Sequence, residues 1–275
     1  HLMYDDGSIA DGFPFEANDK IQSSPSILDV DGQLLIIVGS NDNHLYGINS
    51  DGSLRFAVET ADNVETSPSF LHYSNHCYIF FGDNDGYLYA IDSEGAMYPS
   101  FPMDMGSKIS KSIVFSDLDS DLLPEIIFGT EDGNLHIIHL DESVYHHAPI
   151  SYPFSYHSAP IIYDIDADGD QEIIAGTSLS INVIDIKESG ITDEYWSMYK
   201  GNYKRNGFNQ FTPLCELGDL NEDDTIDILD ILQVINIILN TNDPSPVQLC
   251  ASDLNADGTI DLFDIILLVQ IVLDR

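Results

Sequence analysis

The feature that most constrains this chain is a twelve-residue acidic segment that occurs twice near its end. Residues 219–230 read DLNEDDTIDILD, and residues 253–264, 34 positions later, read DLNADGTIDLFD. Each copy has oxygen-bearing side chains at positions 1, 3, 5, 9 and 12, and Ca²⁺ in proteins takes roughly six to eight oxygen ligands from loops with such spacing. An apolar segment follows each copy directly. The repeat therefore predicts two calcium loops, each leading into a helix.

Composition narrows the classes of partner. The 275 residues include 47 acidic and 9 basic ones, which gives a formal net charge of −38. Such a chain repels the phosphates of nucleic acids, so we expect no nucleic-acid partner. No apolar run reaches the roughly 20 residues that span a bilayer, so no membrane span is expected.

A longer repeat precedes the calcium loops. A β-type run ends in a glycine step at positions 39, 82, 129 and 176, and an alternating strand pattern follows each step. Short strands with a period of about 40–50 residues and no helical pattern between them are typical of β-propeller blades. A β-sandwich is the alternative, and four copies in register favour the propeller.

These repeats predict a mainly β fold, with a partial β-propeller of about four blades plus a remnant, followed by a small α-helical calcium-binding domain. Residues 1–22 are expected to be the remnant of a preceding blade, residues 23–212 the propeller repeats and residues 213–275 the helical domain. The start in mid-repeat suggests the C-terminal part of a longer protein. We expect the cationic segment 195–207 to close or cover the propeller, and residues 208–218 to act as a linker.

Two blades carry an acidic loop just before the strand that ends in glycine. Residues 117–125 and 164–172 share the pattern D-x-D-x-D-x-x-x-E. Carboxylates this close repel one another, and a bound dication removes that cost. We therefore predict up to two further calcium ions. The predicted ligands are Asp117, Asp119, Asp121 and Glu125 in one loop and Asp164, Asp166, Asp168, Asp170 and Glu172 in the other.

These blade loops resemble the FG-GAP/VCBS family, in which a calcium loop precedes a Phe-Gly or similar step. The resemblance covers about residues 110–180. The two earlier repeats are similar to quinoprotein-type blades, as in residues 82–92, GDNDGYLYAID. The doubled loop at the end closely resembles a type I dockerin over about residues 215–275.

The dockerin resemblance implies two half EF-hands, each with one Ca²⁺ and no helix before its loop. The apolar helix faces, which include Ile228, Leu229 and Leu232 in one copy and Leu262, Phe263 and Ile266 in the other, would cover each other. The implied ligands are side chains, main-chain oxygens at the two threonines, and water-mediated contacts at position 9. They are Asp219, Asn221, Asp223, Thr225, Asp227 and Asp230 in the first loop and Asp253, Asn255, Asp257, Thr259, Asp261 and Asp264 in the second.

The chain departs from the dockerin pattern at two places. Asp224 occupies the turn position that Gly258 holds in the second loop, which should weaken the first site. The pairs at the family's partner-recognition positions, 228–229 and 262–263, are more apolar than the usual small or hydroxyl pair. Cys215 and Cys250 precede the two loops at matched places, and whether they are bridged stays open. Cys77 is expected to be a buried free thiol.

These resemblances imply an extracellular, secreted or cell-surface, calcium-dependent binding or tethering module. Its tail would dock on a cohesin-like or other extracellular protein partner, in association with polysaccharide degradation. The alternative is the C-terminal fragment of a secreted polysaccharide-degrading hydrolase whose catalytic domain lies outside this sequence. The chain offers no catalytic constellation, so its status as an enzyme stays open. A calcium-stapled end cap without a partner is a further alternative.

Overall fold

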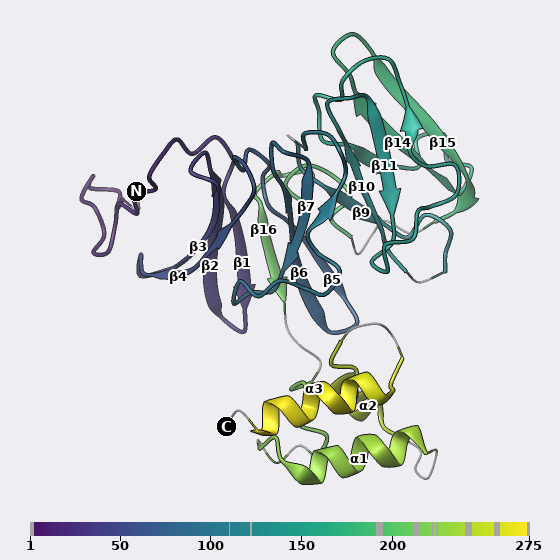
Figure 1. Ribbon diagram of the computed structural model, residues 1–275. Coiled ribbons are helices and arrows are strands. Elements are labelled where there is room, and N and C mark those ends of the chain that lie inside the picture. Colours follow the sequence, from purple (N-terminus) through teal and green to yellow (C-terminus); the bar gives the residue numbers. More distant parts are fainter. Residues whose placement is uncertain are drawn as a thin grey trace. The chain divides into compact units, whose positions relative to one another are not determined.

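Figure 1 shows the computed structural model of the chain. It describes residues 3–109, 111–121, 123–190, 195–211, 215–221, 223, 225–239, 244–255 and 259–273. The chain forms two compact units, one of residues 1–71 and 77–211 and one of residues 72–76 and 212–275.

The described part of the first unit contains four small sheets, each built around strands that are consecutive in sequence, and the first sheet gains one further strand from a later segment (Figure 1). A blade of a propeller has this meander topology, so the prediction of a mainly β fold with repeated small sheets is confirmed. The strands are β1 (Ser26–Val30), β2 (Gln33–Ser40), β3 (His44–Asn49) and β4 (Leu54–Glu59); β5 (Ser69–Tyr73), β6 (His76–Gly82), β7 (Tyr87–Ile91) and β8 (Met103–Asp104); β9 (Val114–Ser116), β10 (Glu125–Gly129), β11 (Asn134–Ile138) and β12 (Ile150–Ser151); and β13 (Ile161–Tyr163), β14 (Asp170–Gly176) and β15 (Ile181–Ser189).

The glycine steps have a packing reason. At three of them a fully buried apolar residue from the segment that leaves the blade lies directly on the glycine. A Cβ on Gly39 would lie 2.4 Å from Val64 Cγ1, one on Gly82 would lie 2.6 Å from Ile109 Cβ, and one on Gly129 would lie 2.4 Å from Tyr156 Cβ. Real Cβ atoms do not approach so closely, so the return of the chain onto its blade requires glycine at these three steps.

The same glycines help to hold the start of each blade. The backbone N–H of Gly39 donates to Ser23 Oγ (2.8 Å), and that of Gly82 donates to Thr66 Oγ1 (2.9 Å). In the fourth sheet, the N–H of Gly176 donates to Ser158 Oγ (2.7 Å). These buried or partly buried hydroxyls fix the segment that enters each of these three blades against the strand that ends in glycine.

The chain after the fourth sheet returns to the first sheet. Strand β16 (Phe208–Phe211) pairs in parallel with β1, from Ile27 opposite Phe208 to Val30 opposite Phe211. The prediction of a linker over residues 208–218 is therefore wrong for residues 208–211. The free edge of β1 offers backbone hydrogen bonds that a linker pattern does not reveal.

A buried lysine fastens the segment before β16. Lys200 is 6% exposed, and its Nζ donates to the carbonyl oxygens of Ser24 (2.9 Å) and Pro25 (2.6 Å) and to Ser26 Oγ (2.9 Å). Burial lowers the pKa of Lys200 to about 8. The ammonium group thus holds the residues that lead into β1.

The second unit contains the helices α1 (Ile228–Ile238), α2 (Pro246–Ser252) and α3 (Leu262–Leu273). The prediction that neither calcium loop has a preceding helix is wrong for the second loop, because α2 ends at Ser252. The sequence does hold a signal for α2, namely Ser245 followed by proline and Gln248. Ser245 Oγ accepts from Gln248 N (3.1 Å), and Gln248 Oε1 accepts from Ser245 N (3.0 Å), which is a capping box.

The core of this unit follows the sequence repeat. Val234 in α1 and Leu268 in α3 are fully buried and 34 residues apart. The prediction that the apolar helix faces cover each other is wrong for Leu229 and Phe263, which are 51% and 66% exposed. The buried side of α1 instead contains Asp230 and Val234, and that of α3 contains Asp264 and Leu268. A buried aspartate thus interrupts the apolar pattern of each helix.

The cysteines have distinct roles. Cys215 and Cys250 form a disulfide with their Cα atoms 6.1 Å apart. It joins the segment before the first loop to α2. Cys77 is free and buried, as the sequence predicts.

The described helices are short. The longest has 12 residues, and none within the described ranges has the length and apolar character that crossing a bilayer demands.

We expect Gly129→Ala to destabilise the first unit by about 1–3 kcal/mol, because the new Cβ collides with buried Tyr156. Gly176→Ala is the matched control, since its Cβ would meet only Ser158 Oγ at 3.0 Å. Urea unfolding followed by fluorescence of the one tryptophan, Trp196, measures both. Equal losses in the two variants would contradict the packing explanation.

Lys200→Met should also destabilise the first unit by about 1–3 kcal/mol, because it removes the donor from two partly buried carbonyl oxygens and from the buried hydroxyl of Ser26. Lys204→Met removes an exposed lysine four residues later and should change the free energy of unfolding little. The same tryptophan signal reports both changes. An unchanged midpoint in the Lys200 variant would show that its contacts do not fasten the segment.

Candidate metal centres

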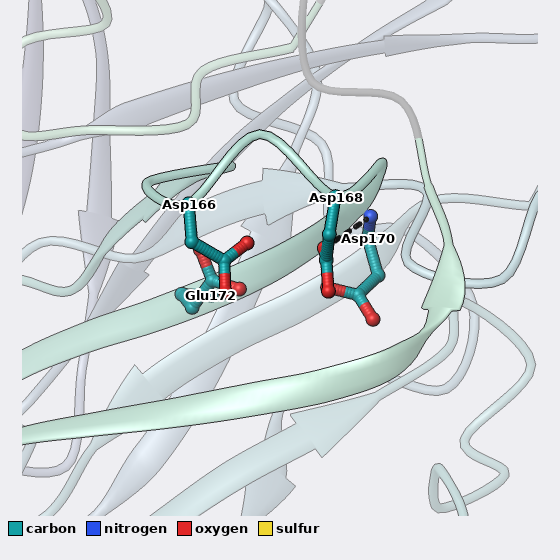
Figure 2. Close-up of side chains that lie close together, drawn as sticks. All are labelled: Asp166, Asp168, Asp170 and Glu172. Carbon is teal, nitrogen blue, oxygen red and sulfur yellow. Dashed lines mark hydrogen bonds between the residues drawn. The ribbon is translucent and has the colours of Figure 1, made fainter.

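The loop between β13 and β14 gathers four carboxylates. Asp166, Asp168, Asp170 and Glu172 each offer one oxygen, and these oxygens all lie within 4.8 Å of one another. Figure 2 shows Asp166 beside Glu172 and Asp168 beside Asp170, all at one loop. Residues 170 and 172 belong to β14, where alternate residues share a face, so the strand itself brings two of the four together.

Glu172 is the buried end of this cluster. Its side chain is 2% exposed, and its Oε2 accepts a hydrogen bond from the backbone N–H of Ile165 (2.7 Å). Its Oε1 is also buried and has no hydrogen-bond partner among the residues that the structure describes. A buried carboxylate oxygen without a donor is costly unless a cation meets it.

Asp164 does not belong to the cluster, although the sequence predicts it as a ligand. Its Oδ1 accepts from Ala167 N (2.6 Å) and its Oδ2 accepts from Gly169 N (3.1 Å). Its carboxylate therefore holds the turn of the loop. Gly169 has φ +97°, a conformation that favours glycine.

A lysine lies beside the same cluster. Lys187 Nζ is 3.6 Å from Asp168 Oδ2 and 3.5 Å from Asp170 Oδ2, and it also pairs with Asp185 at 2.5 Å. The lysine side chain is largely exposed. Its ammonium group would compete with a metal ion for the same oxygens.

The loop between β9 and β10 repeats this arrangement. One oxygen from each of Asp117, Asp119 and Glu125 lies within 4.8 Å of the others. Glu125 is fully buried, and its Oε2 accepts from Leu118 N (2.6 Å), the same contact over seven residues that Glu172 makes. Asp121 lies outside this cluster, and its Oδ1 accepts from Leu123 N (2.7 Å).

The reasoning from sequence missed His139 at this loop. Its Nδ1 is 3.1 Å from Glu125 Oε1. The signal is the strand register, because Ile126 pairs with Ile138, and continuing that register by one residue would set Glu125 opposite His139. The period of the blade could have located this pairing.

The electrostatics of both loops favour a cation. Burial raises the pKa of Glu125 to about 8, and Asp119 and Asp117 add to the shift. The hydrogen bond with Asp168 raises the pKa of Asp170 to about 6. Carboxylates that resist ionisation in this way are stabilised by a hard dication, and all-oxygen donor sets fit Ca²⁺.

In the second unit, a fully buried aspartate ends each predicted calcium loop. Asp230 Oδ1 accepts from the backbone N–H groups of Leu220 (2.9 Å) and Asn221 (3.3 Å), and its Oδ2 accepts from Asp227 N (2.8 Å). Asp264 makes the equivalent contacts 34 residues later, with Leu254 (2.9 Å), Asn255 (3.3 Å) and Asp261 (2.8 Å). Each aspartate thus ties the start of its loop to the start of the following helix.

The residues at loop position 9 have a role that the sequence reasoning missed. Asp227 Oδ1 accepts from Leu229 N (2.7 Å), and Asp261 Oδ1 accepts from Phe263 N (2.7 Å). A side-chain acceptor at this place caps the first turn of a helix. The signal was present, since D-x-x-D before an apolar run is a variant of the capping box.

The remaining predicted ligands of the first loop lie close together. Asp223 N donates to Asp219 Oδ1 (3.2 Å) and to Asn221 Oδ1 (3.0 Å), and Thr225 N donates to Asp223 Oδ1 (3.0 Å). In the second loop, Asp253 is buried and Thr259 is exposed. Asp257 lies outside the described residues, as do Gly258 and its counterpart Asp224.

The helices after the two loops carry matching exposed apolar groups. On α1, Ile228, Leu229 and Leu232 are between 51% and 64% exposed. Their equivalents on α3, which are Leu262, Phe263 and Ile266, are between 45% and 66% exposed. We call these the two apolar triplets. Exposed apolar groups gathered at one place are typical of interaction surfaces.

Residues 217–273 match the family model of the dockerin type I domain. The match confirms the resemblance of the C-terminal part and supports a protein–protein docking role for it. The domain model covers the two loops, the three helices and both apolar triplets.

Solved structures resemble the first unit at low sequence identity. BamB from Moraxella catarrhalis is 16% identical, with a TM-score of 0.44, and the match covers 62% of this chain and 48% of BamB. The computationally designed Ika4 protein is 14% identical, with a TM-score of 0.42, over 63% of this chain and 98% of Ika4. Saccharomyces cerevisiae Sqt1 is 12% identical, with a TM-score of 0.43, over 55% of this chain and 40% of Sqt1. The comparison with curated proteins gives no match.

Replacing Lys187 by Met should raise the affinity of the 164–172 loop for Ca²⁺ about two- to fivefold, because the competing ammonium group is removed. Lys204→Met, which changes the net charge equally at a distant exposed lysine, should leave that affinity unchanged. Calcium titration of the two variants by calorimetry measures the difference. A weaker site in the Lys187 variant would mean that this lysine supports the loop.

Proposed function

We propose that this protein is an extracellular docking module, in which calcium holds the C-terminal domain in the form that binds a cohesin-type protein. The observation that carries this proposal is the match of residues 217–273 to the dockerin type I domain, on which the two apolar triplets are exposed at equivalent places. The first unit is then the part that the docking domain tethers.

Calcium is expected in both parts of the chain. In the C-terminal domain we propose two ions, one in the loop of residues 219–230 and one in the loop of residues 253–264. In the blades we propose up to two more, one with Asp166, Asp168, Asp170 and Glu172 and one with Asp117, Asp119 and Glu125. The clustered oxygens and the buried Oε1 of Glu172 support the assignments in the blades, and the dockerin match supports those in the C-terminal domain.

The surface of this chain that we propose for docking is apolar rather than polar. The pairs at positions 228–229 and 262–263 are large and apolar, and each side chain that becomes buried contributes about 1.5–3 kcal/mol. We therefore expect a partner with a complementary apolar surface. Calcium acts on this surface indirectly, because positions 227 and 261 cap the helices that carry the triplets.

The disulfide and the acidic surface are consistent with a position outside the cell. Disulfides such as Cys215–Cys250 persist in oxidising compartments. The resemblance of the blade loops to FG-GAP/VCBS repeats and the dockerin match together support an association with extracellular polysaccharide-degrading assemblies. This setting is part of the proposal.

Calorimetric titration of the full chain with a type I cohesin domain tests the docking function. We expect binding in the presence of Ca²⁺ and at least a hundredfold loss of affinity in Leu229→Gln/Phe263→Gln, because hot-spot truncations cost about 2–4 kcal/mol or more. Leu239→Gln/Leu273→Gln changes two exposed leucines at the far ends of the same helices and should bind as the wild type does.

Calcium removal provides the second arm of this test. Addition of EDTA should abolish binding and reduce the helix content of the C-terminal domain, since metal-binding energy is folding energy in such small domains. Binding that persists in EDTA, or that is equal in the two double variants, would contradict the proposed docking mode.

A further inference from the structure

A cavity of about 630 Å³ lies in the first unit where the chain enters successive blades. Four of its lining residues hold the same position in the four repeats, two residues before the first of the consecutive strands of each sheet. They are Ser24, Ser67, Ser112 and Ala159. The cavity is therefore a product of the repeat itself.

Hydrogen bonds connect several of the residues that form one wall of this cavity. Ser24 N donates to Ser67 Oγ (3.1 Å), and Ser112 Oγ donates to the carbonyl oxygen of Ser67 (3.2 Å). The hydroxyl of Tyr199 also donates a hydrogen bond to Ser24 Oγ (2.8 Å). The Ser24 and Ser67 hydroxyl oxygens act as acceptors in these bonds, and neither hydroxyl donates to a residue within the described ranges, so each still has a hydrogen to donate.

Two of the nine basic residues of the chain, Lys111 and Arg205, line this cavity. In a chain with 47 acidic residues, other cations such as Arg55, Lys108 and Lys187 pair with carboxylates. The side chains of Lys111 and Arg205 make neither a hydrogen bond nor an ion pair with any residue in the described ranges. The pKa of the Glu65 carboxyl is lowered by its hydrogen bond with Asn84, by Lys108 and, through charge alone, by Lys111. Lys111 therefore lies within the field of one carboxylate, although it makes no direct ion pair with it.

The one carboxylate in the lining is already engaged. Glu65 Oε2 accepts from Lys108 Nζ (2.9 Å), and its Oε1 accepts from Asn84 Nδ2 (3.0 Å). Both oxygens of Glu65 therefore have donors from outside the lining. The donors that line the cavity include the two cations, serine hydroxyls and the side chains of Gln22 and His157.

The remaining wall is apolar. Ile161 of β13, Ile174 of β14, Ile181 at the start of β15 and Met198 contribute to it. A ligand that satisfies both walls has an anionic group for the cations and an apolar body for the isoleucines. A volume of this size lies within the usual range for small-molecule sites.

We infer that this cavity binds a small organic carboxylate with an apolar body. Its carboxylate lies between Lys111 and Arg205 and accepts hydrogen bonds from the serine hydroxyls, and its body packs on Ile161, Ile174 and Met198. A guanidinium and an ammonium group together favour an oxyanion over a neutral group of the same shape. This binding site is independent of the docking domain.

Fluorine NMR of the full chain with 4-fluorophenylacetate tests the inference at low ionic strength. The neutral isostere 4-fluorophenylacetamide is the ligand control. We expect the carboxylate to bind at least about tenfold more tightly than the amide, because only the carboxylate gains charge-assisted hydrogen bonds. Equal binding of the two compounds, or no binding of either at millimolar concentration, would overturn the inference.

The variant Lys111→Met/Arg205→Met should lose at least about tenfold in affinity for the carboxylate. Lys20→Met/Lys204→Met removes the same charge from lysines outside the lining and should lose little, which separates local contacts from the general field. Arg205→Met alone, at an exposed turn, should fold and lose part of the affinity. Equal losses in the two double variants would overturn the site.

Discussion

The structure depends on buried carboxylates that organise acidic loops. Each of the four predicted calcium loops ends in a carboxylate that is at most 2% exposed and that accepts a backbone N–H from the start of its own loop. The pairs are Glu125 with Leu118, Glu172 with Ile165, Asp230 with Leu220 and Asp264 with Leu254. The same hydrogen bond, from a backbone N–H at the start of the loop to the carboxylate at its end, thus closes loops before β-strands and loops before helices.

This arrangement brings mutually repelling carboxylates close together, and cations near them would reduce the repulsion. Burial and neighbouring carboxylates raise the pKa of Glu125, and a neighbouring carboxylate raises that of Asp170. The chain as a whole carries a formal charge of −38, and such self-repulsion opposes a compact state. Positively charged side chains offset part of this repulsion, as Lys187 does beside Asp168 and Asp170. Calcium is the cation that the all-oxygen clusters favour elsewhere.

Most of the features of the fold that could be predicted were indicated by the sequence repeats. The glycine steps indicated the four sheets, and the copies of residues 219–230 and 253–264 indicated two similar loop–helix units. Helix α2 and the caps at Asp227 and Asp261 were missed although their signals are local, whereas the other misses depend on contacts between segments apart in sequence. Strand β16 exists because β1 has a free edge, and His139 meets Glu125 only through the strand register. Lys200 is buried by residues more than 170 positions away.

The helical faces illustrate a different limit. An apolar side chain on a helix is by default assigned to the core, yet Ile228 and Leu229 are exposed while Val234 is buried. Position 230 turns inward because its carboxylate serves the loop, and this sets the rotation of the whole helix. Hydropathy alone does not contain that information. The aspartate at the end of the loop does, once the loop is recognised.

The most direct test of this account is calorimetric titration of the metal-depleted full chain with Ca²⁺, followed in parallel by circular dichroism. The account predicts about four bound ions and a gain of helix as the C-terminal loops fill. It also predicts one ion fewer in Glu172→Gln and two fewer in Asp230→Asn/Asp264→Asn. A chain that binds no calcium, or that binds the same number of ions in all three proteins, would contradict the role given to the buried carboxylates.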